Sequence, residues 1–287
     1  MKKVKVIGLV IAVLVLLGGV AFYLYLNKMI TAPVHYSVKG TENVIVKKDI
    51  VYSDKSKVLN TLDIYLPKDY NKKKKYPAVL FVSGDIYGFM AKGLKNWKIY
   101  EDYGRMLAAS GYIAVVQNRR MSATFSTLIE ANEDISAVIS KLKSNAFDLN
   151  VKGITIWSFS GGGIYLGKIL SQHKIRSLIT FYSAMNPMVM RKYIPEEITD
   201  KKIAEFSMLE FAKKNDTMIP LFIAKAGKDR EMINGSIDQL KKILDEKKMT
   251  YSFELHKDGE HGFDVLNKND RTKEIISKAL KFLKDNS

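Results

Sequence analysis

Ser160 is the residue of this chain best placed to act as a nucleophile. It follows an apolar run, residues 154–157, and precedes a helix-like stretch, residues 164–170. A serine on such a strand-to-helix turn has a strained backbone, and small residues two positions away on either side relieve the crowding. Ser158 and Gly162 hold these positions, so the run predicts a nucleophilic serine, with a Cβ at position 158 where glycine is preferred.

The same glycine-rich run has a second interpretation, a turn that cradles a phosphate at the start of a helix. The lysine and hydroxyl residue of a P-loop do not follow it, and the glycine spacing of a dinucleotide site is missing. We therefore favour the nucleophile.

An acid and a histidine follow Ser160 in the chain order that a triad of this kind requires. Asp229 comes just after an apolar run, residues 220–226, and so lies beyond the carboxyl end of a predicted strand. His261 lies in a turn after the strand-like stretch 249–256. We predict that Asp229 orients His261 and that His261 acts as the base.

Histidine is scarce, since the chain has 4 in all. His35 lies just beyond the N-terminal apolar segment and His173 ends the helix that begins at the serine turn, so neither has the expected position. His256 remains a rival, although a side chain at the end of a strand reaches the turn less freely than one in the next loop. For the acid, Asp258 and Glu260 remain alternatives.

At these positions the chain resembles the α/β-hydrolase fold superfamily, in its esterase, lipase and dienelactone-hydrolase-like group. The resemblance covers residues 44–285. It rests on an early strand motif at 62–67, a core strand entering the oxyanion loop at 76–84, a buried strand at 111–120 and the histidine loop at 261–263. It implies a mostly parallel sheet of about eight strands, with helices on both faces and a small cap.

The oxyanion loop departs from the family, which commonly has His-Gly where this chain has Ser83-Gly84-Asp85. Because an oxyanion hole uses backbone N–H groups, the missing histidine need not abolish it. We predict Gly161, with Gly84 or Asp85, as the donors. A carboxylate at position 85 would oppose a developing oxyanion unless it points away.

Alternating segments predict the same α/β architecture from hydrophobic patterning alone. Strands are expected near residues 44–52, 60–66, 78–82, 112–116, 153–157, 177–182, 220–226 and 250–255, and helices near 97–110, 127–144, 161–172, 232–246 and 270–285. Residues 183–217 form a longer connection than usual, which we interpret as a small cap over the site.

The N-terminal segment predicts a membrane anchor. Residues 6–26 carry no charge, and at about 1.5 Å per residue a helix of this length matches a hydrocarbon core of about 30 Å. Lysines gather before the run, which places the N-terminus in the cytoplasm and the rest outside. We thus expect a signal anchor at 1–30, a stalk at 31–43 and an extracytoplasmic hydrolase domain at 44–287; a cleaved signal peptide and a secreted protein are the alternative.

Composition narrows the function further. The chain has no cysteine, which excludes disulfides, thiolate metal sites and a cysteine nucleophile. Of its net charge of +16, four lysines lie before Thr31 and the excess of 12 is spread through the domain, and no nucleic-acid-binding motif accompanies it. Contact with anionic lipid or wall polymer is the simpler hypothesis.

The chemistry that these residues predict is hydrolysis of a small-molecule ester by Ser160, His261 and Asp229, with no metal or organic cofactor. Two alternatives stay open. The same triad could transfer an acyl group to another acceptor or cleave peptides, or the fold could serve as a non-catalytic binding protein.

Overall fold

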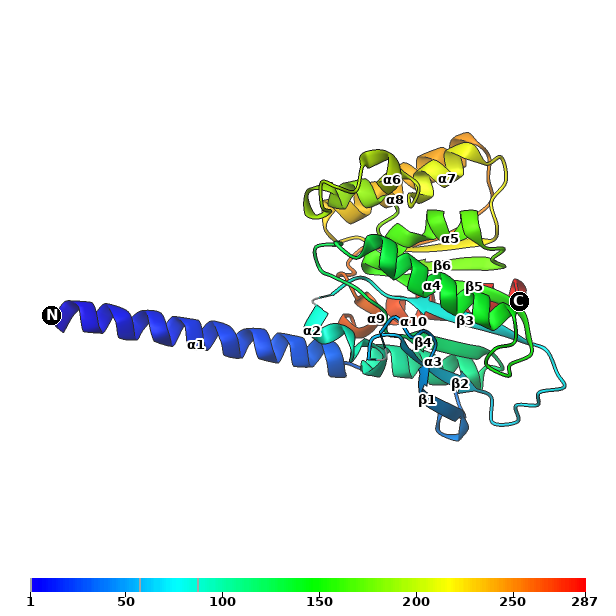
Figure 1. The fold of residues 1–287 in the computed structure, drawn as a ribbon, viewed down its shortest axis with the longest axis horizontal. Coiled ribbons are helices and arrows are strands. Elements are labelled where there is room, and N and C mark those ends of the chain that lie inside the picture. The colour runs from blue at the N-terminus through cyan, green and yellow to red at the C-terminus, as the bar shows by residue number, and fades with distance from the viewer. Residues whose placement is uncertain (1, 57, 87) are drawn as a thin grey trace.

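The computed structural model describes residues 2–56, 58–86 and 88–287 (Figure 1). Its centre is one sheet with the strand order β1-β2-β4-β3-β5-β6-β7-β8. The first two strands run antiparallel to their neighbours, and the strands from β4 to β8 are parallel. The strands are β1 (Ile45–Val51), β2 (Thr61–Leu66), β3 (Tyr76–Val82), β4 (Ile113–Gln117), β5 (Val151–Phe159), β6 (Ser177–Phe181), β7 (Leu221–Ala226) and β8 (Ser252–His256).

Two hydrophobic cores lie on the two faces of this sheet, because successive side chains of a strand point to opposite sides. In β3, Ala78, Leu80 and Val82 belong to one core, whereas Val79 and Phe81 belong to the other. Every residue of β2 and β4 is buried, as expected for strands covered on both faces. The predicted α/β sheet is therefore confirmed.

The helices divide between the two faces. The first core includes buried side chains of α4 (Leu128–Lys143), α5 (Leu166–Gln172) and α8 (Glu231–Glu246). The second includes those of α3 (Lys98–Ala109) and α10 (Asp270–Asp285). The shorter helices are α2 (Gly88–Ala91), α9 (Phe263–Leu266), η1 (Thr41–Asn43) and η2 (Leu94–Asn96).

The helix predicted at 161–172 begins differently from the expectation. Its first part is a 3-10 helix, η3 (Ser160–Tyr165), and α5 follows it. The glycines of this turn press against neighbouring backbone, and the tighter winding accommodates that approach.

The connection at 183–217 folds into η4 (Pro187–Tyr193), α6 (Asp200–Ala204) and α7 (Met208–Lys214). It packs beside α5 and α8, and Figure 1 shows α6, α7 and α8 gathered at one side of the molecule. Gly167 of α5 makes the close approach, since a Cβ there would lie 2.3 Å from the Ser207 carbonyl oxygen. That this segment caps the site stays a prediction.

Residues 31–43, the predicted stalk, contact the hydrolase domain along part of their length. Ala32 and Val34 are buried in the second core. The Val34 N–H donates to Asp102 Oδ2 at 3.0 Å, and the His35 N–H donates to the Asp264 carbonyl oxygen at 2.9 Å. This stretch therefore lies against α3 and α9.

Helix α1 (Lys2–Thr31) extends away from the sheet (Figure 1). Within the described part of the chain, no helix combines the length and the apolar character needed to cross a membrane. The anchor predicted at 1–30 rests on the uncharged run at 6–26, which lies partly outside the described residues, because the side chains of 6–12, 14 and 25 are not among them.

Candidate active site

Ser160 stands at a sharp turn between β5 and η3. Its φ of 53° is left-handed, a conformation that serine rarely adopts without support from its surroundings. The support includes Gly162, where a Cβ would lie only 2.1 Å from the Val82 carbonyl oxygen. Glycine at position 162 lets the turn sit directly against β3, which fixes the direction of the Ser160 side chain.

Ser158 occupies the position where the pattern prefers glycine, and the structure explains why serine fits. Its side chain is buried, and its Oγ lies 3.0 Å from the Oγ of Ser183, two residues beyond the end of β6. The hydroxyl thus finds a hydrogen-bonding partner inside the protein, which a buried polar group needs.

The structure brings the three residues of the predicted triad together. Ser160 Oγ lies 2.7 Å from His261 Nε2, and His261 Nδ1 lies 2.7 Å from Asp229 Oδ2. With Nδ1–H donating to the carboxylate, Nε2 carries the lone pair that accepts the serine proton. The Asp229 side chain is fully buried, whereas that of His261 is 27% exposed, so the imidazole faces the solvent side of the site.

Two loops that follow neighbouring strands hold the acid against the histidine. The Gly227 N–H donates to the His256 carbonyl oxygen at 2.8 Å, and the Lys228 N–H donates to the Gly259 carbonyl oxygen at 2.9 Å. A Cβ on Gly227 would lie 2.1 Å from the Lys257 carbonyl oxygen. Backbone contact between the loops after β7 and β8 therefore sets the distance from Asp229 to His261.

His256, the alternative base, and Asp258, an alternative acid, contact side chains outside the triad. His256 is buried, and its Nε2 lies 3.1 Å from Thr272 Oγ1 and 3.2 Å from Asn269 Oδ1. Asp258 pairs with Lys228 at 3.6 Å. Neither residue is in the chain of hydrogen bonds that reaches Ser160.

Two side chains flank the imidazole of His261. The Tyr182 ring lies edge to face with its centroid 4.9 Å away. Arg230 Nη2 lies 3.4 Å from Nδ1 and 3.3 Å from Nε2, and the Arg230 N–H donates to Asp229 Oδ1 at 2.7 Å. These contacts limit how far the ring can rotate away from Ser160.

The residues predicted as oxyanion donors lie close to one another and to Ser160. A Cβ built on Gly84 would lie 2.9 Å from the Gly161 nitrogen and 3.2 Å from Ser160 Oγ, and one built on Gly161 would lie 3.6 Å from the Asp85 nitrogen. The backbone of the oxyanion loop therefore closes on the amide that follows Ser160. A side chain at position 84 would crowd this approach, and glycine avoids that.

The Asp85 carboxylate turns away from this space. Its Oδ1 accepts from Arg119 Nη2 at 2.5 Å, and its Oδ2 accepts from the Tyr165 hydroxyl at 2.7 Å. Burial raises the pKa of the Asp85 carboxyl above its ordinary value, and the Arg119 guanidinium opposes this effect. The carboxylate thus has its own cation and does not oppose a developing oxyanion.

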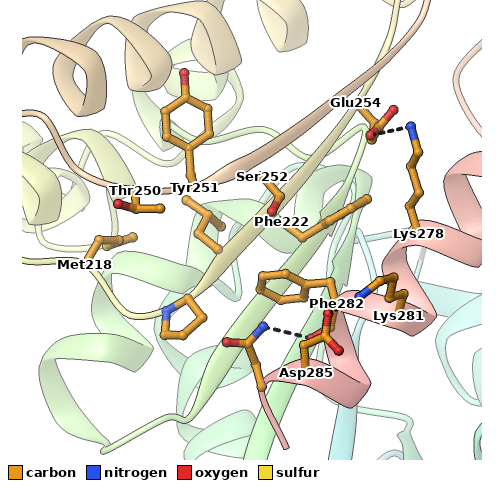
Figure 2. A pocket seen from close by; sticks show the side chains of 13 residues that line it. Met218, Phe222, Thr250, Tyr251, Ser252, Glu254, Lys278, Lys281, Phe282 and Asp285 are labelled. Atoms are coloured by element: carbon orange, nitrogen blue, oxygen red, sulfur yellow. Dashed lines mark hydrogen bonds and ion pairs between the residues drawn. The ribbon is translucent and has the colours of Figure 1, made fainter.

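The surface hollow shown in Figure 2 is separate from this site. It has a volume of about 500 Å³ and includes Met218, Pro220, Tyr251 and Phe282. Pro220 directly precedes β7, so the hollow lies at the end of the sheet opposite to the triad. Within residues 2–56, 58–86 and 88–287, no group of three or more histidine, aspartate or glutamate side chains could hold a metal ion.

Comparisons with known proteins agree with this architecture. The BD-FAE family model matches residues 62–177. Esterase B from Lactobacillus rhamnosis has a similar structure, with a TM-score of 0.65, 17% identity and coverage of 85% of each chain. The chain has the α/β-hydrolase fold.

Other structures share the α/β-hydrolase fold with a similar degree of structural similarity. A carbohydrate esterase from gut microbiota has a TM-score of 0.63 at 17% identity, with 86% of this chain and 99% of that chain covered. An acylaminoacyl peptidase from Pyrococcus horikoshii has a TM-score of 0.61 at 17% identity, with 84% of this chain but only 40% of that chain covered. No curated protein matches.

Sequence reasoning missed several residues of this α/β-hydrolase site. Arg119 and Tyr165 engage Asp85, and Arg230 and Tyr182 flank His261. One signal was available for Arg119, since it lies two residues beyond an apolar strand, at the sheet edge where functional groups gather.

Proposed function

We propose that the protein is a serine hydrolase that cleaves carboxylic esters through an acyl-enzyme. The observation that carries this proposal is the hydrogen-bonded series Asp229, His261 and Ser160 at a left-handed serine turn. The confirmed α/β-hydrolase fold supports it, because this fold presents such a series at the carboxyl edge of its sheet.

Ser160 Oγ attacks the ester carbonyl carbon while its proton moves to His261 Nε2. The tetrahedral intermediate expels the alcohol, which takes that proton from Nε2, and the acyl group stays on Ser160. Water then attacks the acyl carbon and gives a proton to Nε2. The bond from the acyl carbon to Ser160 Oγ breaks, this oxygen takes the proton back from Nε2, and the carboxylic acid is released. Asp229 holds the imidazole and stabilises its positive charge during both halves.

The negative charge on the carbonyl oxygen is assigned to the pocket beside Gly84. Backbone N–H groups of Gly161 and Asp85 border this pocket, and each such donor is worth about 10²–10³-fold in turnover. Gly84 serves as the residue that leaves room for the oxygen.

Small-molecule esters are the proposed substrates. The imidazole is partly exposed, so the reacting atoms lie close to solvent. Acyl transfer to another acceptor or peptide cleavage would use the same residues, and comparison of ester, amide and added-alcohol reactions distinguishes them. The structural neighbour with peptidase activity in its name is more than twice as long as the matched region.

For location, we propose that the hydrolase domain lies outside the cytoplasm, tethered by residues 1–30. The support is the uncharged run at 6–26 and the lysines that precede it. Carbonate extraction of membranes, followed by protease treatment of intact cells, tests this. Full release by carbonate without a shortened mature chain would contradict the anchor, and a shortened released chain would indicate cleavage.

Labelling with a fluorophosphonate probe tests the central proposal. We expect wild-type protein to be labelled and to hydrolyse p-nitrophenyl esters, and Ser160→Ala to lose labelling and at least about 10⁴-fold of turnover. Ser158→Ala, which keeps the turn, is the matched control. Equal labelling of wild type and Ser160→Ala would exclude Ser160, and an unlabelled folded wild type would favour a non-catalytic binding protein.

A further inference from the structure

A fully buried ion pair lies behind the oxyanion loop. The side chains of Arg119 and Asp85 have no solvent exposure, and their charged atoms are 2.5 Å apart. Asp85 follows β3 and Arg119 follows β4, which are paired as parallel strands. The pair therefore sits at the carboxyl edge of the sheet, directly under the candidate active site.

The guanidinium of Arg119 holds the loop on both sides of Gly84. Its Nη1 donates to Ser83 Oγ at 2.9 Å, and its Nη2 donates to the Ser83 carbonyl oxygen at 2.8 Å and to Asp85 Oδ1 at 2.5 Å. The residues before and after Gly84 are thus fixed by one rigid planar group.

Tyr165 connects this loop to the segment that carries the nucleophile. Its hydroxyl donates to Asp85 Oδ2 at 2.7 Å, and the Arg119 guanidinium lies 5.2 Å from its ring centroid. Tyr165 is the last residue of η3, which begins at Ser160. The same three side chains therefore link two backbone segments, the oxyanion loop and the 3-10 helix that begins at Ser160.

By itself, a buried ion pair adds little to the stability of a fold. Two buried charges lose hydration, and apolar residues of similar volume often serve the fold as well or better. Its benefit is geometric, because oxyanion donors act only when their positions are fixed before the reaction.

We propose that Arg119, Asp85 and Tyr165 are positioning residues that align the backbone N–H groups of Asp85 and Gly161 on the oxyanion. This inference rests on the proposed ester hydrolysis. It also accounts for an aspartate in a loop where a carboxylate would otherwise oppose the reaction.

The test compares Arg119→Met and Tyr165→Phe with wild type. For Arg119→Met we expect kcat to fall about 10- to 100-fold with KM changed less than about 3-fold, because the donors act in the transition state. The affinity for an alkyl trifluoromethyl ketone, which forms a tetrahedral adduct, should fall by the same factor as kcat/KM. Tyr165→Phe should show a smaller loss of the same kind.

Arg120→Met is the matched control. Arg120 is the next residue along the chain, and it pairs with Asp134 and Glu133, away from the oxyanion loop. We expect it to leave kcat and inhibitor affinity within about 2-fold of wild type. Equal losses in both arginine variants would overturn the positioning role.

Hydrogen–deuterium exchange of peptides that contain residues 83–86 and 161–163 gives a readout independent of turnover. We expect faster exchange in Tyr165→Phe, with exchange in β5 and α10 unchanged. If Arg119→Met does not fold, Tyr165→Phe still carries both tests. Unchanged exchange in Tyr165→Phe would overturn the positioning role, even if that variant is inactive. Faster exchange in Tyr165→Phe, together with a wild-type protein that the fluorophosphonate probe does not label, would overturn only the proposed function.

Discussion

At the scale of single residues, this site depends on two glycines, Gly84 and Gly162, which have no Cβ atom. Gly84 faces the Gly161 nitrogen and Ser160 Oγ, whereas Gly162 faces the carbonyl oxygen of Val82. We assign the space beside the first glycine to a reacting atom, whereas the second lets the turn pack. Substituting them therefore separates chemistry from folding.

Gly84→Ala should lower kcat by about 10²-fold or more, because its Cβ would occupy the pocket assigned to the oxyanion. Steady-state hydrolysis of a p-nitrophenyl ester, with a thermal melt of each protein, checks this. Gly235→Ala is the control, since Gly235 has nothing within 4 Å of an added Cβ. Full activity of a folded Gly84→Ala protein would place the oxyanion elsewhere.

Asp229→Asn should keep the fold and lose about 10⁴-fold in turnover. An amide at this position favours the wrong imidazole tautomer, because its NH₂ group cannot accept the Nδ1 proton. Asp258→Asn, which alters only the exposed pair with Lys228, is the control. Comparable turnover in the two variants would remove Asp229 from the triad.

Asp264 gives a prediction about pH and stability. Burial raises its pKa to about 6, although the Tyr182 and Tyr103 hydroxyls donate to the carboxylate and act in the opposite direction. The unfolded chain, with an ordinary aspartate, loses this proton at lower pH than the folded protein does. The contribution of Asp264 to the free energy of unfolding is therefore largest below pH 4 and is lost as the pH rises toward 6.

Asp264→Asn removes this titration. Between pH 4 and 7, the free energy of unfolding of the variant should gain about 2 kcal/mol relative to wild type, which is most of the change expected for this pKa difference. Urea unfolding at several pH values measures it. A constant difference between the two proteins would show that Asp264 has an ordinary pKa in the folded state.

At the scale of elements, the short stretch after α1 is part of the domain. Val34 is 7% exposed, and its N–H bonds to Asp102 of α3. We expect Val34→Ala to lower the free energy of unfolding by about 1–2 kcal/mol, through lost burial and a small cavity. Val58→Ala, at a position 62% exposed, should change it by less than about 0.5 kcal/mol. Equal effects in chemical denaturation would mean that the stretch is not docked.

The sequence predicted the long elements well, because their patterns are local. Buried strands appear as apolar runs, and α8 and α10 show one apolar face each. The order of Ser160, Asp229 and His261 also follows from loops that succeed strands, which is why these three residues could be assigned from the sequence.

Features that depend on distant contacts were not predictable. Arg119 is a charged residue just after a strand, which is typical of an exposed loop. Its burial depends on Asp85, which is 34 residues away in the sequence. The burial of Val34 depends on α3, which begins 64 residues later. The short helices at 183–217 lack the repeated periodicity that identifies longer ones.

At the scale of the whole molecule, the net charge of +16 predicts attraction to anionic surfaces. The protein lacking residues 1–30, which loses four lysines and keeps a net charge of +12, should bind vesicles that contain phosphatidylglycerol at low salt. It should be released near 1 M salt, where the Debye length is about 3 Å. Vesicles of phosphatidylcholine alone are the control. No retention at low salt would reject this hypothesis.

The position of β8 at the edge of the sheet has a consequence for synthesis of the chain. β8 pairs with β7, and His261 lies in the loop that follows it. Under the proposed mechanism, a growing polypeptide therefore carries a Ser160 without its base until residue 261 has been made. Under that mechanism, activity begins only when β8 and the loop after it join the sheet and bring His261 to a serine that was made about a hundred residues earlier.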